Sequence, residues 1–138
     1  MKPPVFLNAM LLLGGCAAAS LSSTLTAGTP SAVSDVFSCA REQVQALGYS
    51  QTSIDVRDHR LTARRIDETV RKSDVRFRRS FDDLEIEVGP QASGETGLTI
   101  VASTFSEYVT QRGFTLEQER ASNGVKAAAQ SILEMCGQ

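Results

Sequence analysis

Few side chains in this sequence carry the chemistry of an active site. His59 is the one histidine, and it lies in Asp58-His59-Arg60, where we expect a hairpin turn. A catalytic histidine needs an activated nucleophile beside it, and no serine here lies in a nucleophile-elbow motif. Asp55 and Asp58 could hold a metal ion with His59, but aspartate is common in turns for conformational reasons. We therefore predict no enzymatic activity, no metal site and no cofactor.

Two further groups of side chains are candidates for chemistry or binding. Asp82 and Asp83 are adjacent carboxylates, and glycoside hydrolysis uses a pair of such groups. Adjacent residues at the start of a strand point in opposite directions, so a turn is the simpler interpretation. Phe105, Tyr108 and Phe114 are expected in the core or at the edge of a sheet, with a binding surface as the alternative.

The first 16 residues have the features of an export signal in the usual order. Lys2 precedes a short apolar run over residues 5–13, well below the roughly 20 residues that a spanning helix needs. Leu13-Gly14-Gly15-Cys16 follows, and it resembles the lipobox of bacterial lipoproteins. The resemblance implies that residues 1–15 are removed and that Cys16 carries a diacylglycerol and an acyl chain such as palmitate. An ordinary secretory signal with a chance cysteine is the alternative.

The same resemblance implies a place in the cell. Among lipoproteins of enteric bacteria, Asp after the lipidated cysteine favours the inner membrane, whereas this chain has Ala17. We therefore expect the outer membrane, facing the periplasm. Residues 16–29 carry no charge and no aromatic group, which predicts a flexible tether before a domain over residues 30–138. The expected partners are the membrane and other envelope proteins or anionic lipids; the net charge of -2 predicts no nucleic-acid binding.

Two cysteines remain if Cys16 carries lipid. Cys39 and Cys136 form an even pair in an oxidising compartment, which favours a disulfide between them. A redox pair or a metal site are the alternatives, although the sequence has no Cys-x-x-Cys motif.

Charge is distributed unevenly along the chain. Residues 57–81 contain nine basic and four acidic side chains, whereas residues 82–119 contain eight acidic and one basic. The basic segment over residues 57–79 could bind an anionic ligand such as a phospholipid headgroup or lipopolysaccharide. The candidate side chains for this role are Arg71, Lys72, Arg76, Arg78 and Arg79. We expect that most of the basic segment is neutralised within the fold, with Arg64 near Glu85 and Glu87, and ligand binding is the alternative.

The positions of apolar residues predict the elements that hold these side chains. Spacings of three and four predict helices over residues 30–47 and 123–136. Alternation predicts strands over residues 53–57, 61–64, 83–88 and 98–109. Residues 67–81 fit neither pattern and are expected to form an irregular connection. The predicted fold is α+β, with a four-stranded antiparallel sheet and two helices packed on one face of it.

This arrangement is similar to the helix-grip domains of some outer-membrane assembly lipoproteins. It also resembles small, uncharacterised envelope lipoproteins that have one cysteine in each helix. Neither likeness implies a particular activity. We expect a non-enzymatic, membrane-anchored envelope lipoprotein that acts as an interaction or structural module. The alternative is a binder of anionic envelope ligands through residues 57–79.

Overall fold

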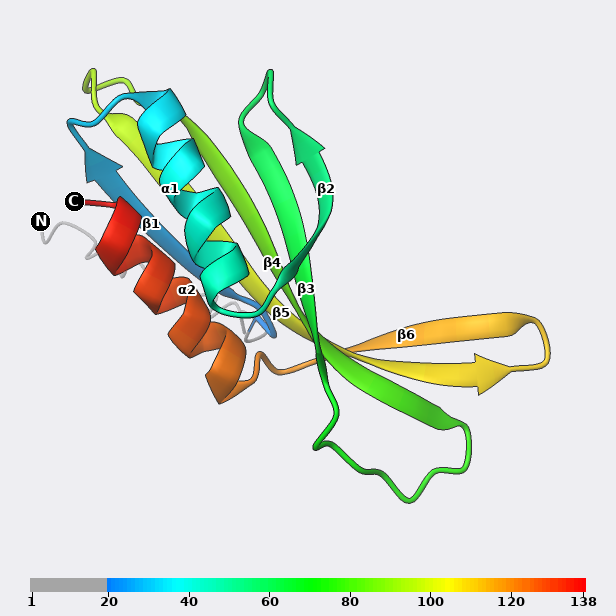
Figure 1. Cartoon of the computed structure of the whole chain (residues 1–138). Helices are drawn as coiled ribbons and strands as arrows, with labels where there is room; N and C mark the ends of the chain where they lie inside the picture. Colours follow the sequence, from blue (N-terminus) through cyan, green and yellow to red (C-terminus); the bar gives the residue numbers. More distant parts are fainter. Residues whose placement is uncertain (1–19) are drawn as a thin grey trace, which may run out of the picture.

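The computed structural model describes residues 20–138, and within that span the chain forms two helices and six strands (Figure 1). The expected signal peptide, the lipobox and Cys16 lie outside the described residues. In chain order the elements are β1 (Ser23–Thr29), α1 (Val33–Ala46), β2 (Ser50–Asp55), β3 (Arg60–Asp67), β4 (Phe77–Pro90), β5 (Thr96–Thr110), β6 (Gly113–Glu119) and α2 (Asn123–Cys136).

The strands form one antiparallel sheet in the order β1-β5-β4-β3-β2, with β6 paired to β5 as well. Both helices cover one face of this sheet, which confirms the predicted two-layer α+β arrangement (Figure 1). The predicted number of four strands was wrong, because β1 and β6 were not foreseen. They lie on the same side of β5, where β1 pairs with its first half and β6 with its second half.

Strand β1 falls in the segment that was expected to be a flexible tether. Its alternation is weak: Leu25 and Ala27 alternate with threonine, and Leu25, which packs against the core, is the one large apolar residue of the strand. Threonine nevertheless favours strands, and the edge of β5 offers unpaired backbone groups along residues 96–102. The folded domain therefore begins at least seven residues before the predicted boundary at residue 30, because Ser23 already pairs with Ala102.

The first helix also starts later than predicted. Thr29 is the last residue of β1, so a helix cannot begin directly after it at residue 30. Helix α1 begins at Val33, after Ala32. The second helix spans the predicted residues, and its N-terminus is capped by Ser122, whose hydroxyl accepts a hydrogen bond from the backbone N–H of Val125 at 3.1 Å.

The core lies between the helices and the covered half of the sheet. Its strand residues alternate as expected for one buried face, and the helix residues form one stripe each. From the sheet it includes Leu61, Ala63, Leu84, Ile86, Val88, Leu98, Ile100 and Ala102. From the helices it includes Val36, Phe37, Ala40, Val44, Val125, Ala128, Ala129 and Ile132.

Strand β4 has 14 residues and extends well beyond the predicted strand over residues 83–88, whereas β5 has 15 and only slightly exceeds the predicted residues 98–109. Their outer parts continue beyond the helices, together with β6 (Figure 1). We call this extension the arm and define it as residues 77–82, 104–110 and 113–119. The stretch over residues 67–81 is thus only partly irregular, because β3 reaches Asp67 and β4 starts at Phe77.

Candidate functional site

The two helices are joined by a disulfide. Cys39 of α1 and Cys136 of α2 are bonded, with their Cα atoms 5.7 Å apart. This confirms the predicted pair and explains how two short helices stay side by side on the sheet. Cys136 is buried within the core and Cys39 packs against it, so the bond joins the two helices at the core.

The basic side chains of β3 pair with acids on β4, on the face of the sheet away from the helices. Arg64 donates two hydrogen bonds to the carboxylate of Asp83, at 2.7 and 2.9 Å, and this contact raises the pKa of Arg64. Arg60 pairs with Glu87 at 3.2 Å. We predicted Glu85 and Glu87 as the acidic neighbours of Arg64. The register instead places Asp83 opposite Arg64, two residues earlier on β4 than Glu85.

Four of the five candidate anion-binding residues have an acidic partner. Lys72 pairs with Glu119, and the hydrogen bond between them raises the pKa of Lys72. Arg76 pairs with Asp74 at 2.9 Å, and this contact lowers the pKa of Asp74. Arg78 and Arg79 both approach Glu107, at 3.9 and 3.3 Å. Arg71 instead donates to the backbone carbonyls of Glu68 and Val70.

These five residues are divided between the two faces of the arm. The ammonium of Lys72 lies 5.8 Å from the ring centre of Phe77 and 5.9 Å from that of Tyr108, on the helix side. Glu107 precedes Tyr108 on β5 and so points to the other face, where it meets Arg79. Arg71, Arg78 and Arg79 do line one hollow of about 430 Å³, but Asp67 and Glu68 line it too. The segment therefore contains no concentrated, unpaired positive charge.

His59 and the nearby aspartates have structural roles. Asp55 accepts a hydrogen bond from the backbone N–H of Asp58 at 3.0 Å, which closes the turn. The His59 ring packs edge-on against Phe37, with ring centres 5.3 Å apart. Across residues 20–138 the structure brings together no group of three side chains suited to a metal ion.

The turn expected at Asp82 and Asp83 was wrong, because both residues lie within β4 and pair with β3 and β5. As neighbours on a strand they point to opposite faces of the sheet. Asp83 meets Arg64 on the open face, whereas Asp82 is 2% exposed beneath α2. The carboxylate of Asp82 accepts hydrogen bonds from Thr104 at 2.6 Å and from Ser122, the residue that caps α2, at 3.0 Å. Asp82 therefore joins β4, β5 and the start of α2, a role that nothing in the local sequence indicates.

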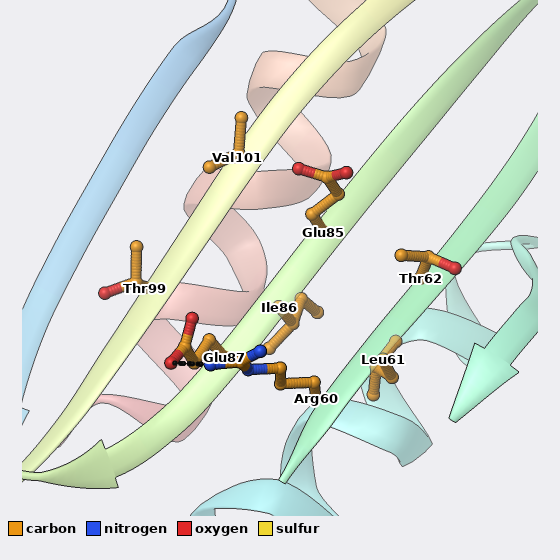
Figure 2. A pocket seen from close by; sticks show the side chains of 8 residues that line it. All are labelled: Arg60, Leu61, Thr62, Glu85, Ile86, Glu87, Thr99 and Val101. Carbon is orange, nitrogen blue, oxygen red and sulfur yellow. Dashed lines mark hydrogen bonds and ion pairs between the residues drawn. The ribbon is translucent and has the colours of Figure 1, made fainter. Parts of the chain in front are cut away.

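A shallow hollow lies on the open face of the sheet, outside the arm. Figure 2 shows side chains from three neighbouring strands around it, with Arg60 and Glu87 joined by an ion pair. The hollow measures about 290 Å³, and both charged groups of the pair are about 60% exposed. An exposed pair of this kind contributes little, and the remaining polar residues are Thr62, Glu85 and Thr99. The carboxylate of Glu87 is paired with Arg60, and the Thr62 hydroxyl is hydrogen-bonded to the hydroxyls of Thr52 and Ser53.

The arm exposes apolar side chains on its open face. The register pairs Val109 with Phe114, and Leu116 follows Phe114 on the same face of β6. Their exposed fractions are 43%, 62% and 50%, respectively. The guanidinium of Arg78 lies 5.3 Å from the ring centre of Phe114. We call Val109, Phe114 and Leu116 the apolar strip.

The three aromatic residues singled out in the sequence have different surroundings. Tyr108 is 8% exposed under Lys72, and Phe105 stacks on the buried Phe81 with ring centres 5.6 Å apart. Of these three aromatic residues, only Phe114 is largely exposed to solvent. The alternation of Phe114 and Leu116 with Thr115 and Glu117 is the signal that would have predicted β6.

The strip lies beside an open strand edge. Within residues 20–138, β6 pairs with β5 on one side and with no strand on the other. Its seven residues include no proline and no lysine, and its pairing with β5 has no bulge, although Glu117 and Glu119 place two charges on the strand. In natural sheets, proline, lysine and bulges on an edge strand commonly prevent it from pairing with another chain.

No protein-family model matches this sequence, and no curated protein matches it. No helix in the described part of the chain is both long and apolar enough to cross a membrane.

Proposed function

We propose that this protein is a non-enzymatic lipoprotein of the bacterial cell envelope, anchored by lipid on Cys16 and acting as an interaction module. The order of charge, apolar run, small residues and cysteine over residues 1–16 supports the anchor. The outer membrane, facing the periplasm, is the proposed location. The observation that carries the interaction role is the apolar strip beside the open edge of β6. Contiguous exposed apolar groups on a soluble domain are a common mark of a contact surface.

Removal of the lipid attachment site tests the anchor. The Cys16→Ser variant is expected to lack lipid and to leave the membrane fraction. Mass spectrometry of the native protein should show cleavage before Cys16 and added acyl chains. A Cys16→Ser variant that sediments quantitatively with membranes would contradict the proposed anchor.

The interaction role is tested by photocrosslinking in intact cells. A photoreactive residue replacing Phe114 should give discrete adducts with an envelope component. The matched control replaces Val56, which has the same exposed fraction of 62% but lies in the turn between β2 and β3, far from the arm (Figure 1). Equal adduct yields at the two positions would argue against an interaction surface on the arm.

A second candidate function is binding of anionic envelope ligands by the basic segment. It is supported by one observation, the hollow lined by Arg71, Arg78 and Arg79, in which Arg71 has no acidic partner within residues 20–138. The acids around the other four basic residues weaken it. We therefore give preference to the interaction module.

A further inference from the structure

Almost no unpaired acidic side chain lies on the face of the arm that contains the apolar strip. Glu107 lies opposite Leu116 in the sheet and is the acid of the arm on this face. It is 9% exposed and is covered by Arg79 at 3.3 Å and Arg78 at 3.9 Å. Glu117 and Glu119 alternate with the strip residues and so point to the other face. The exposed surface at the strip is therefore apolar with a basic margin.

Further basic side chains lie at both ends of β6. Arg112 is at the turn between β5 and β6, whereas Arg120 and Lys126 lie where β6 ends and α2 begins. All three are exposed, and none forms an ion pair with any residue in the described span. Arg120 and Lys126 line a hollow of about 300 Å³ together with Leu21. Arg112 and Arg120 flank the strip along β6, whereas Lys126 belongs to α2, which covers the other face of the sheet. Arg112 and Arg120 therefore suit an anionic surface in contact with the arm.

The N-terminal chain leaves the sheet at the base of the arm. The Ser22 hydroxyl hydrogen-bonds with Ser103 at 2.9 Å and accepts from the Gln118 amide at 2.7 Å. The carbonyl of Leu21 accepts from the backbone N–H of Ala121 at 2.9 Å. Strand β1 therefore starts where β6 ends, on the same side of β5.

The distance from this point to the lipid is short. Cys16 and Leu21 are five residues apart in sequence, so even a fully extended chain between them spans no more than about 18 Å. The seven residues of β6 extend about 24 Å from the same point. The tether is therefore shorter than β6, and a lipid on Cys16 keeps the base of the arm closer to the bilayer than the length of the arm itself.

We propose that the arm docks on the bilayer that holds the lipid anchor, with Phe114 and Leu116 in the headgroup region and Arg112 and Arg120 near anionic headgroups. This inference rests on the proposed lipid at Cys16. The short tether favours a lipid surface over a second protein or a second copy of the chain, because it confines the arm beside the membrane. Cations flanking exposed apolar side chains are the usual composition of a surface that binds at the interface.

The test uses the full chain from Cys16 onward with a phospholipid attached chemically. Because Cys39 and Cys136 are bonded to each other, Cys16 is the one cysteine left for a maleimide phospholipid. The chain has no tryptophan, so Phe114→Trp introduces a single indole. Val56→Trp is the matched control, because the native side chain there has the same exposed fraction of 62%. Circular dichroism of both variants verifies that they are folded.

Both variants are anchored in vesicles of phosphatidylethanolamine and phosphatidylglycerol. When the phospholipids carry bromine on their acyl chains, we expect the fluorescence of the Phe114→Trp variant to fall at least twofold and its emission to shift to the blue. The fluorescence of the Val56→Trp variant should be unaffected. Equal, weak quenching of the two variants would overturn the inference. A blue shift of the Phe114→Trp variant without bromine quenching would also overturn it, because protein would then cover the strip.

The charges are tested in the same system. Replacing Arg112 and Arg120 with serine in the Phe114→Trp variant should reduce bromine quenching at least threefold in anionic vesicles. Unchanged quenching would show that these cations do not contribute to docking on the bilayer. Chemical anchoring separates this inference from the proposed function. If Cys16 carries no lipid in cells, the proposed function fails whatever the vesicles show. If it does carry lipid and the indole at position 114 is not quenched, only the docking fails.

Discussion

Asp82 shows how one side chain can join three elements. Its buried carboxylate accepts hydrogen bonds from Thr104 on β5 and from Ser122 at the start of α2. Arg65 lies 4.0 Å from the same carboxylate. Within this low-polarity site, hydrogen bonds to a charged group are stronger than on the surface, and an unpaired partner is costly.

We predict that Asp82→Ala lowers the free energy of unfolding by about 2–3 kcal/mol, because it leaves two hydroxyl groups without their acceptor. The control is the adjacent Asp83→Ala, which removes a partly exposed pair with Arg64 and should cost no more than about 1 kcal/mol. Urea unfolding of the oxidised proteins measures both. Equal losses for the two variants would contradict the structural role of Asp82.

Tyr49 provides a prediction on pH. Burial raises the pKa of Tyr49 to about 12, while Arg65 lowers it and Asp82 raises it further. The folded protein therefore holds this proton more tightly than the unfolded chain, whose tyrosine titrates near pH 10. The resulting stabilisation is complete below about pH 10 and is lost as the pH rises toward about 12.

Native protein should therefore lose more stability between about pH 9 and about pH 11 than the Tyr49→Phe variant does, as measured by urea unfolding. At pH 7 the variant should be about as stable as the native protein, since the Tyr49 hydroxyl has no hydrogen-bond partner within residues 20–138. An identical pH dependence in the two proteins would show that Tyr49 does not cause the loss.

At the scale of elements, the disulfide governs how the helices are held. It joins α1 to α2 across a separation of 97 residues. A crosslink across a loop of this length contributes about 4.7 kcal/mol in the chain-entropy model, mainly by restricting the unfolded chain. That is a large part of the roughly 5–15 kcal/mol that stabilises a typical domain.

We predict that the double variant Cys39→Ser/Cys136→Ser unfolds with a free energy about 3–5 kcal/mol below that of the oxidised protein. Thiol labelling of the denatured, non-reduced native protein should modify neither cysteine. Labelling of both would rule out the bond in the mature protein.

At the scale of the whole molecule, acidic side chains on β4, β5 and β6 neutralise much of the basic segment. The uneven charge along the sequence is thus largely cancelled in space, because antiparallel pairing brings residues 60–67 beside residues 80–87. Cross-strand pairs of opposite charge contribute roughly 0.2–1 kcal/mol each.

The same arrangement predicts how the domain without lipid meets membranes. Replacing Arg71 and Arg76 with serine should change its co-sedimentation with anionic vesicles by less than twofold at low salt, as should the control substitutions Arg41→Ser and Arg57→Ser. A loss specific to the first pair, and steeply dependent on salt, would instead support ligand binding by the basic segment.

Several features of the molecule were determined by local sequence patterns. The apolar stripes from Val33 to Leu47 and from Val125 to Cys136 predicted both helices, and the alternation around Ile86 predicted a strand. The pair Cys39 and Cys136 was predicted from cysteine number and compartment. These features depend on neighbours within a few turns of helix or residues of strand, or on composition, so they can be recognised without knowledge of the fold.

Only the tertiary structure decided the position of β1, the existence of the arm and the surroundings of Asp82 and Phe114. Strand β1 is polar and forms because β5 is long enough to pair with it beyond the reach of β6. Alternation assigns Phe114 and Leu116 to one face of β6 but does not say whether another layer covers that face. Coverage depends on where the helices end relative to the sheet, which is set by contacts between residues far apart in the chain.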